Sequence, residues 1–249
     1  MSKTKLLSLE VRNFDRAWVA RVPWVELRVA MFGRPQLLHR ASTLVVVAKP
    51  SGWLVHPAGT DRPDVMAWLE SQGLDGLVPV HRLDAETSGV TLFAPRSEAG
   101  RWGEAFATGQ VEKRYLALVF GHPRAKGIVR RALSDGRRGY ALEAVTRYRT
   151  LESFPRCALV AARPETGRKH QIRRHLQRIG HAVVGDARYR PRGKRTVPAF
   201  PGRLWLHAEA LEIDGVRHVA PLPQELEDHL IVLRAKARDA GKPPADDVS

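Results

Sequence analysis

The chain of 249 residues contains one cysteine and no long apolar run, and its acidic residues are outnumbered by basic ones. A single thiol, Cys157, excludes an internal disulfide and a zinc site built from cysteines. No segment approaches the ~20 apolar residues that a membrane span needs, and the N-terminus lacks the ~7–15 apolar residues of a secretory signal. We therefore expect a soluble, cytoplasmic protein with no membrane partner.

Positive charge is what the sequence has in excess. Lys and Arg number 41 against 26 Asp and Glu, which gives a net charge of +15 and a pI near 10.8. Eleven basic residues but only two acids lie between Arg163 and Arg195, so the charge is concentrated in this part of the chain. Such a surface attracts a polyanion, and nucleic acid is the leading candidate.

The hydrophobic pattern predicts a chain that mixes strands and helices. Thr166 is the expected N-cap of a helix whose aliphatic side faces the core and whose other side carries His170 and Arg173. A basic loop is expected at 122–140. The predicted strands are 44–48, 90–94, 113–121, 141–150, 156–162 and 204–213, and the predicted helices are 64–72, 97–108, 166–180 and 223–240.

One short polar loop combines several features that suit catalysis. Residues 81–89 read HRLDAETSG and precede an apolar run. Gly89 gives the backbone freedom before that run, and Thr87 and Ser88 hydrogen-bond locally in such turns. This arrangement presents the carboxylate of Asp84 at a sheet edge, as a nucleophile requires. From the residues alone, an ordinary turn aspartate is the commoner interpretation.

Two further segments also allow more than one interpretation when each is considered alone. Residues 113–121, KRYLALVFG, are apolar on both faces, so Tyr115 fits a core aromatic of an interior strand. Residues 166–175, TGRKHQIRRH, begin a basic helix that suits either solvent or RNA contact. Residues 180–189 contain His181 and Asp186, for which a structural turn is favoured over a metal site.

Together these segments resemble the motifs of the RluA-type RNA pseudouridine synthases, in the family's order and over roughly residues 40–230. The resemblance implies an α+β fold with a mixed, largely antiparallel sheet and flanking helices. It also implies the isomerisation of uridine to pseudouridine in tRNA or rRNA after the base is flipped out. No metal, redox cofactor or protein partner is required by this reaction.

The resemblance assigns the three catalytic positions to Asp84, Tyr115 and Arg173. The aspartate is the family's catalytic residue, and the arginine that follows His-Gln-Ile pairs with it. A guanidinium beside a carboxylate favours the charged form that a nucleophile needs. The tyrosine lies against the target base, for which its ring gives a stacking face and its hydroxyl a hydrogen bond.

The substrate-binding positions are expected to be Arg82, Leu206, Arg168, Lys169 and His170. Arg82 adjoins the aspartate and would occupy the space left by the flipped base. The leucine of the Leu-His-Ala strand would pack under the uracil and exclude water. The other three belong to the basic motif and would contact RNA, and Lys169 stands where many members have Thr or Ser.

The resemblance also predicts the domain organisation and the RNA class. Residues 1–36 would form an N-terminal arm, 37–240 the catalytic domain and 241–249 a disordered tail. The KPSGWLVH segment at 49–56 and the motif at 166–175 look most like the tRNA-modifying branch.

Three alternatives stay open. The chain could be a non-catalytic RNA-binding or remodelling protein on the same fold, although Asp84, Tyr115 and Arg173 are intact. A glycosidase-like hydrolase would break the same bond without rejoining it. A metal-dependent nuclease would use a set of histidines with Asp84, but their spacing is not that of a known metal motif. Its candidate ligands are His56, His81, Asp84, His170 and His175.

Overall fold

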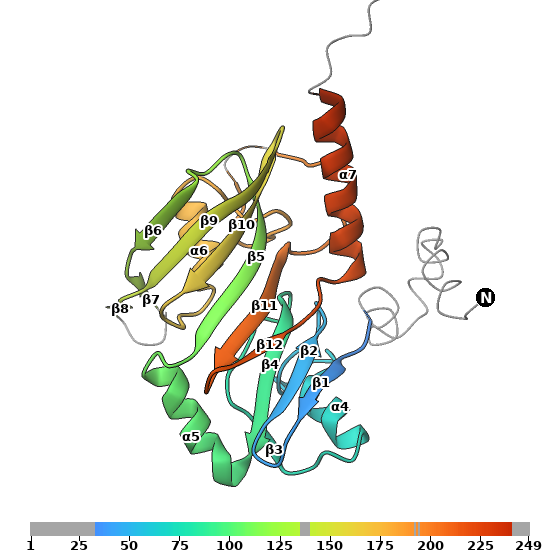
Figure 1. Cartoon of the computed structure of the whole chain (residues 1–249), viewed down its shortest axis with the longest axis vertical. Coiled ribbons are helices and arrows are strands. Elements are labelled where there is room, and N and C mark those ends of the chain that lie inside the picture. Colours follow the sequence, from blue (N-terminus) through green and yellow to red (C-terminus); the bar gives the residue numbers. More distant parts are fainter. Residues whose placement is uncertain (1–32, 135–139, 192, 194, 241–249) are drawn as a thin grey trace, which may run out of the picture. The chain divides into compact units, whose positions relative to one another are not determined.

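A computed structural model describes residues 33–134, 140–191, 193 and 195–240 of the chain (Figure 1). It divides between Glu104 and Ala105 into two compact units, unit 1 and unit 2. Almost all of the predicted N-terminal arm, and the whole predicted tail, lie outside the described residues. A single catalytic domain over 37–240 stays a prediction. None of the described helices is long and apolar enough to span a membrane.

Unit 1 contains a small antiparallel sheet built around one buried strand. Its elements are β1 (Gln36–Arg40), β2 (Val45–Lys49), α4 (Val65–Ser71), β3 (Leu77–Pro79), β4 (Ser88–Pro95) and α5 (Arg96–Ala107), which runs on into unit 2. Strand β4 pairs with β2 from Phe93 to Gly89 and also with β3. Seven of its eight residues are buried, which explains its continuous apolar sequence. The loop that carries Asp84 therefore leads directly into the most buried strand of the unit.

Unit 2 contains a larger antiparallel sheet in the order β12-β11-β5-β10-β9-β6. A separate two-stranded ribbon, β7 with β8, adjoins it in sequence. The elements are β5 (Glu112–Phe120), β6 (Lys126–Arg130), β7 (Leu133–Ser134), β8 (Ala141–Leu142), β9 (Val145–Phe154), β10 (Cys157–Pro164), α6 (Gln171–Arg178), β11 (Leu206–Ile213), β12 (Val216–Val219) and α7 (Gln224–Ala240).

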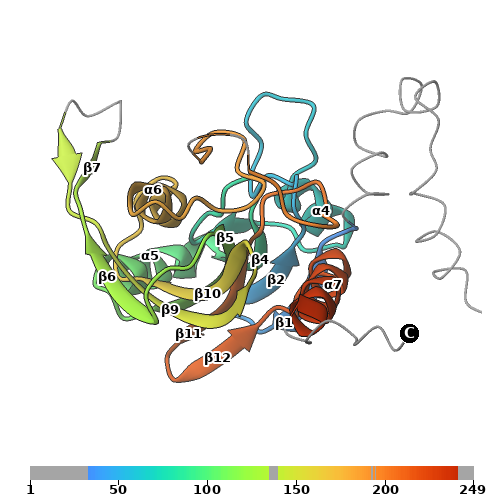
Figure 2. The same ribbon diagram turned by 90° about the horizontal axis from the view of Figure 1, so that it is seen from above.

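The two faces of the unit 2 sheet are covered by different helices. Alternate residues of a strand point to opposite faces, so β5 contributes Leu116 and Leu118 to one face and Ala117 and Val119 to the other. The first pair packs in a cluster with the leucines of α7, and the second in a cluster with Ile172 of α6. Figure 2 shows α6 lying over the strands β9 and β10. This two-sided burial is why the strand reads as apolar throughout.

The α+β prediction, with a largely antiparallel sheet and flanking helices, is confirmed, but two local predictions are wrong. Helix α6 begins at Gln171 with His170 as its N-cap, and not at Thr166, whose hydroxyl instead hydrogen-bonds the side chain of Gln171 at 2.6 Å. The segment 122–140, predicted as loop, contains β6 and β7. Strand β6 is recognisable only through its pairing with β9, because its own sequence has little apolar alternation.

The buried imidazole of His207 gives a test of how stability depends on pH. Its side chain is 1% exposed, and Nε2–H donates to the carbonyl of Ala220 at 3.1 Å. Burial lowers the pKa of His207 from 6.5 to about 4. Between these values the unfolded chain binds a proton that the folded chain does not. The stabilising effect is therefore complete above pH 6.5 and is lost as the pH falls through 4.

We expect this one group to lower the free energy of unfolding by about 3 kcal/mol across that range. The variant His207→Gln keeps an N–H donor but has no group that titrates there. Urea unfolding above pH 6.5 and near pH 4 should therefore show a shallower pH dependence for the variant than for wild type. Equal dependence in the two proteins would contradict the assignment.

Candidate active site

A buried lysine in unit 1 fixes the loop that carries Asp84. Lys49 is 1% exposed, and its ammonium donates to the carbonyls of Pro50 at 3.0 Å, Trp53 at 2.7 Å and Ala85 at 3.0 Å. An ammonium has three N–H donors, so these carbonyls compensate its loss of water. The Lys-Pro-Ser-Gly turn is thereby tied to the residue immediately after Asp84.

The backbone around Asp84 is held at several further points. The amide of Gly52 donates to the Ala85 carbonyl at 2.7 Å, and the hydroxyl of Ser51 donates to the carbonyl of Glu86 at 2.9 Å. The amide of Thr87 donates to the Asp84 carbonyl at 3.0 Å. The carboxylate of Asp84 is half-buried, whereas its neighbour Arg82 is exposed. The loop thus holds a partly accessible carboxylate on a fixed backbone, which is what a positioned nucleophile needs.

Unit 2 brings Tyr115 and Leu206 to the sheet face that α6 covers. Leu206 is 3% exposed and belongs to the same cluster as Ile172 and Leu176, and the half-buried ring of Tyr115 packs against that cluster. Leu206 pairs with Ala117, two residues along β5 from Tyr115. Because residues two apart share a face, the tyrosine and the leucine lie on the same side of neighbouring strands.

Arg173 is buried, contrary to the expectation that it lies on the outer side of its helix. Its side chain is 8% exposed and forms a two-point ion pair with Asp186, whose side chain is fully buried. Nε donates to Oδ2 at 2.7 Å and Nη2 donates to Oδ1 at 2.9 Å. A buried guanidinium requires such a partner, because an isolated charge in the interior costs several kcal/mol.

Asp186 is also held by its own turn. Its Oδ1 accepts the backbone N–H groups of Arg188 and Tyr189, both at 2.9 Å. Burial opposes its ionisation, but the hydrogen bond from Arg173, helped by the two backbone N–H groups, lowers the pKa of Asp186 below its ordinary value. The favoured interpretation of this segment as a structural turn agrees with these contacts.

His170 and Tyr189 lie beside this ion pair. The Nδ1 atom of His170 is 2.9 Å from the hydroxyl of Tyr189, and the guanidinium carbon of Arg173 lies 5.3 Å from the centre of the tyrosine ring. His170 has a φ of 55°, a left-handed conformation that costs energy in a residue with a side chain. The α6 N-terminus therefore has a constrained backbone next to a charged pair.

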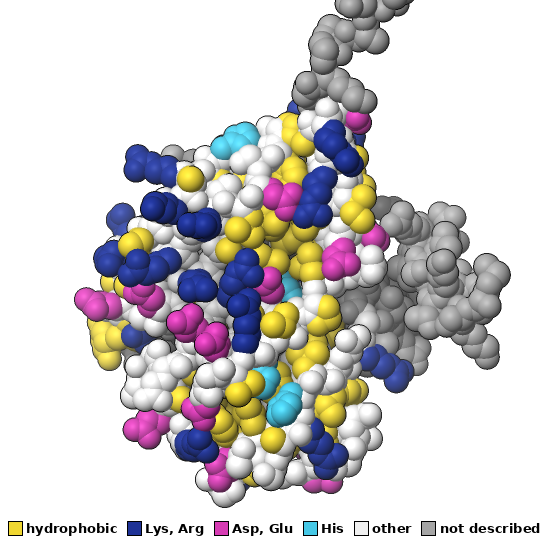
Figure 3. Space-filling view, in the orientation of Figure 1, with side chains coloured by type: hydrophobic (Ala, Val, Ile, Leu, Met, Phe, Trp, Pro, Cys, Tyr) yellow, Lys and Arg dark blue, Asp and Glu magenta, His cyan; other side chains and the backbone are white. Residues whose placement is uncertain are grey.

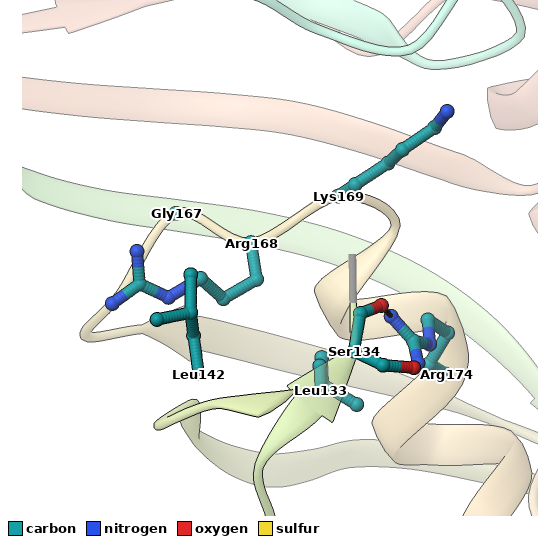
Figure 4. Close-up of a pocket in the computed structure, with 7 residues that line it drawn as sticks. All are labelled: Leu133, Ser134, Leu142, Gly167, Arg168, Lys169 and Arg174. Atoms are coloured by element: carbon teal, nitrogen blue, oxygen red, sulfur yellow. Dashed lines mark hydrogen bonds between the residues drawn. The ribbon is translucent and has the colours of Figure 1, made fainter. Parts of the chain in front are cut away.

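The basic residues before and on α6 line a pocket of about 160 Å³ together with Leu133, Ser134 and Leu142. Arg174 reaches Ser134, to whose carbonyl it donates at 3.0 Å, and Arg168 donates to the Glu143 carbonyl at 3.0 Å. In Figure 4 the exposed side chain of Lys169 extends away from this pocket. Arg168, Lys169 and Arg174 therefore point in different directions from the segment that surrounds the start of α6.

Basic side chains are not confined to the α6 face. Figure 3 shows Lys and Arg over β6 and β9 on the face of unit 2 that α7 covers, with acidic groups among them. There Arg147 pairs with Glu165 and Arg163 pairs with Glu112. Charge on this face is thus partly neutralised within the protein, which makes it a useful comparison surface.

Two histidines considered as metal ligands are engaged elsewhere. His170 contacts Tyr189, while fully buried His175 binds the hydroxyl of Thr146 at 2.9 Å and the carbonyl of Arg131 at 3.0 Å. Within the described residues, no three His, Cys, Asp or Glu side chains group closely enough to hold a metal ion.

The predicted site residues thus fall into two sets. Asp84 and Arg82 lie on one loop of unit 1, while Tyr115, Arg173 and Leu206 lie on β5, α6 and β11 of unit 2. Arg168, Lys169 and His170 immediately precede α6. Three residues around these sets were not singled out from the sequence as functional: Lys49, Asp186 and Tyr189. The sequence signals that contain them are KPSG at residues 49–52 and GDARY at residues 185–189.

Comparison with known proteins identifies the family. Residues 43–178 match the RNA pseudouridylate synthase family. A tRNA pseudouridine synthase C of Haemophilus ducreyi is 36% identical over 202 residues, which is 70% of this chain and 83% of that protein. A ribosomal large subunit pseudouridine synthase D of Zymomonas mobilis is 34% identical, over 72% of this chain and 63% of that protein.

The fold agrees with this result. The solved structure of human RNA pseudouridylate synthase domain containing 4 superposes with a TM-score of 0.69 at 29% identity, covering 80% of this chain and 92% of that one. The matched region contains the Asp84 loop, β5 and all of α6. The chain therefore belongs to the RluA-type RNA pseudouridine synthases.

Proposed function

We propose that this RNA pseudouridine synthase modifies a uridine of tRNA and that Asp84 is its nucleophile. The observation that carries the choice of RNA is the 36% identity to a tRNA pseudouridine synthase C across 83% of that protein. The similarity to a ribosomal large subunit enzyme is nearly as high but spans 63% of that relative. Ribosomal RNA is therefore the second candidate. In this proposal the enzyme acts in the cytoplasm and needs no protein partner.

In this proposal the reaction proceeds on a flipped-out uridine. The N1–C1′ bond breaks, the uracil turns, and C5 bonds to C1′ while its proton leaves and N1 gains one. The rigid backbone around Asp84 supports its assignment, since a nucleophile must be placed before the bond breaks. Attack at C1′, attack at C6 and removal of a ribose proton each need this carboxylate in its charged form.

The remaining roles in the proposal follow from chemistry that each side chain offers. Arg173 would stand beside Asp84 and favour its ionised form. Tyr115 and Leu206 share one sheet face, which supports their action as a stacking surface and an apolar floor that keep the detached uracil from water. Arg82 is exposed next to the aspartate, as a residue that replaces the flipped base must be.

The RNA assignment is tested with transcripts that contain tritium at C5 of uridine. Forming the C5–C1′ bond releases this tritium to water, so release measures turnover directly. The proposal predicts stoichiometric release from a set of tRNA transcripts and none from fragments of 23S rRNA. Release from ribosomal fragments alone would overturn the tRNA assignment and favour the second candidate. Appearance of free uracil would instead indicate a hydrolase.

A basic surface that contacts phosphates predicts salt-dependent binding. Each phosphate contact contributes roughly 0.7 to the slope of log affinity against log salt for single-stranded regions and roughly 0.9 for duplex. We expect Lys169→Ala to weaken tRNA binding and to lower the magnitude of this slope by about the contribution of one phosphate contact. Fluorescence anisotropy over a salt series measures both quantities.

Lys126→Ala is the matched control for this measurement. Lys126 is an exposed lysine on β6. It lies opposite Arg149 in the β6–β9 register, and both side chains are on the sheet face away from α6. Its loss removes the same charge from unit 2 and should leave the slope close to that of wild type. Equal changes in the two variants would mean that only net charge matters.

A further inference from the structure

In the ion pair of Arg173 and Asp186, the carboxylate is held by backbone groups as well as by the guanidinium. Asp186 lies in a turn whose carboxylate accepts two backbone N–H groups, and its own amide donates to the carbonyl of Val183 at 3.2 Å. An arginine side chain, in contrast, has several rotatable bonds and about 2 kcal/mol of rotamer entropy to lose. The fixed group is therefore the carboxylate, and the guanidinium is the group that it orients.

The turn has no room to move toward the segment that precedes β11. Gly185 has a φ of 77°, and a Cβ atom there would lie 2.1 Å from the carbonyl oxygen of Arg203. Such close backbone contact requires glycine. The position of Asp186 is thus set by the fold of unit 2 before any contribution from Arg173.

Tyr189 provides a second restraint on the same guanidinium. Its ring lies 5.3 Å from the guanidinium carbon of Arg173, within the range of a cation–π contact. Its hydroxyl contacts His170 at the left-handed start of α6, which holds the ring in place. The guanidinium of Arg173 is therefore hydrogen-bonded along one edge to a carboxylate and contacts an aromatic ring.

We infer that Asp186 and Tyr189 are positioning residues that fix the guanidinium of Arg173 for catalysis. They act through Arg173 and do not touch the RNA. The two-point pair engages two of the five N–H donors of the guanidinium. The inference rests on the proposed role of Arg173 beside Asp84.

The test compares Asp186→Asn with a matched control, Glu225→Gln. Glu225 is the partner of another buried arginine of unit 2, Arg203, at 2.8 Å, and lies on α7. Both variants replace a carboxylate by an amide opposite a buried guanidinium. We expect Asp186→Asn to lower the single-turnover rate by roughly 10- to 100-fold with little change in tRNA affinity. Glu225→Gln should keep the rate of wild type at a temperature where both are folded.

A double-mutant cycle with Arg173→Lys separates positioning from general stability. The ammonium of a lysine lacks the planar pair of N–H donors that forms the two-point ion pair. Asp186→Asn should therefore have little further effect on the rate in the Arg173→Lys background. The same fold-loss in both backgrounds would overturn the inference. If Asp186→Asn does not fold, Tyr189→Leu is measured in the same two backgrounds. A lower single-turnover rate with Arg173 present, and no further decrease in the Arg173→Lys background, supports the inference.

A readout without RNA keeps this test separate from the proposed function. In ¹H–¹⁵N spectra, the Nε–H signal of Arg173 is identified by its absence from Arg173→Lys. Slow exchange of this proton with water is expected in wild type and in Glu225→Gln, and fast exchange in Asp186→Asn. An unchanged exchange rate in Asp186→Asn would refute the positioning role. If wild type forms no pseudouridine on any RNA, the proposed function fails, while this exchange measurement still decides whether Asp186 holds Arg173.

Discussion

Replacing Asp84 by asparagine is expected to reduce pseudouridine formation by at least roughly 10³-fold, because the variant has no carboxylate to attack or to accept a proton. Asparagine has nearly the same shape. The bonds that fix the loop join backbone atoms of Asp84, Ala85 and Glu86 to groups that the change leaves intact. The loss should therefore report chemistry and not unfolding. Tritium release under single-turnover conditions measures it.

Two controls make this result specific. The melting temperature should stay close to that of wild type, and tRNA affinity should change by no more than a few-fold. Turnover within tenfold of wild type would mean that another group is the nucleophile. Loss of both binding and stability would mean that Asp84 has a structural role.

Arg173→Met is expected to destabilise the protein by about 3–5 kcal/mol and to abolish turnover. The change leaves the fully buried carboxylate of Asp186 without its cationic partner, which is the costly way to break a buried ion pair. The backbone N–H groups of Arg188 and Tyr189 still donate to this carboxylate, which limits the loss of stability. Urea unfolding measures the change in the free energy of unfolding.

The double variant Arg173→Met/Asp186→Asn separates the two effects. It removes both charges while the amide oxygen of asparagine still accepts the backbone N–H groups. Much of the lost stability should return, since no uncompensated charge is left in the interior. Turnover should stay absent, because the variant lacks the guanidinium that the proposal assigns to the ionisation of Asp84. A double variant that regains activity would contradict the catalytic role of Arg173.

The strands and helices with simple apolar patterns were predictable from sequence. Strand β5 has apolar residues on both faces and lies inside the unit 2 sheet, as expected. The predicted helix at 223–240 corresponds to α7, and its Leu226, Leu230 and Leu233 are all buried in one cluster. Cys157 is buried as well, and burial raises the pKa of its thiol to about 11, in keeping with an inert side chain.

The polar interior was not predictable from the same pattern. Gln171, Arg173 and His175 are buried on α6, although a helix with these residues reads as mostly solvent-facing. Their partners are distant in the sequence: His175 binds Thr146, and Arg173 binds Asp186. Hydrophobic periodicity does not record such pairs, and the burial of Lys49 under the Asp84 loop was missed for the same reason.

The candidate site came from the resemblance and not from spacing alone. On their own, Asp84 fitted a turn residue and Tyr115 a core aromatic, and Tyr115 does pack against a buried cluster. Four segments in the order of one family made the assignment, and the family match over residues 43–178 confirms the membership. The roles of the individual residues remain predictions, for which the variants above are designed.

The most direct measurement is a map of pseudouridine across total RNA from cells that lack this gene, restored with either wild type or Asp84→Asn. Loss of pseudouridine at one or a few tRNA positions, with restoration by wild type but not by Asp84→Asn, is the expected result. An unchanged map after deletion, or full restoration by Asp84→Asn, would contradict the claim that this carboxylate isomerises uridine in tRNA.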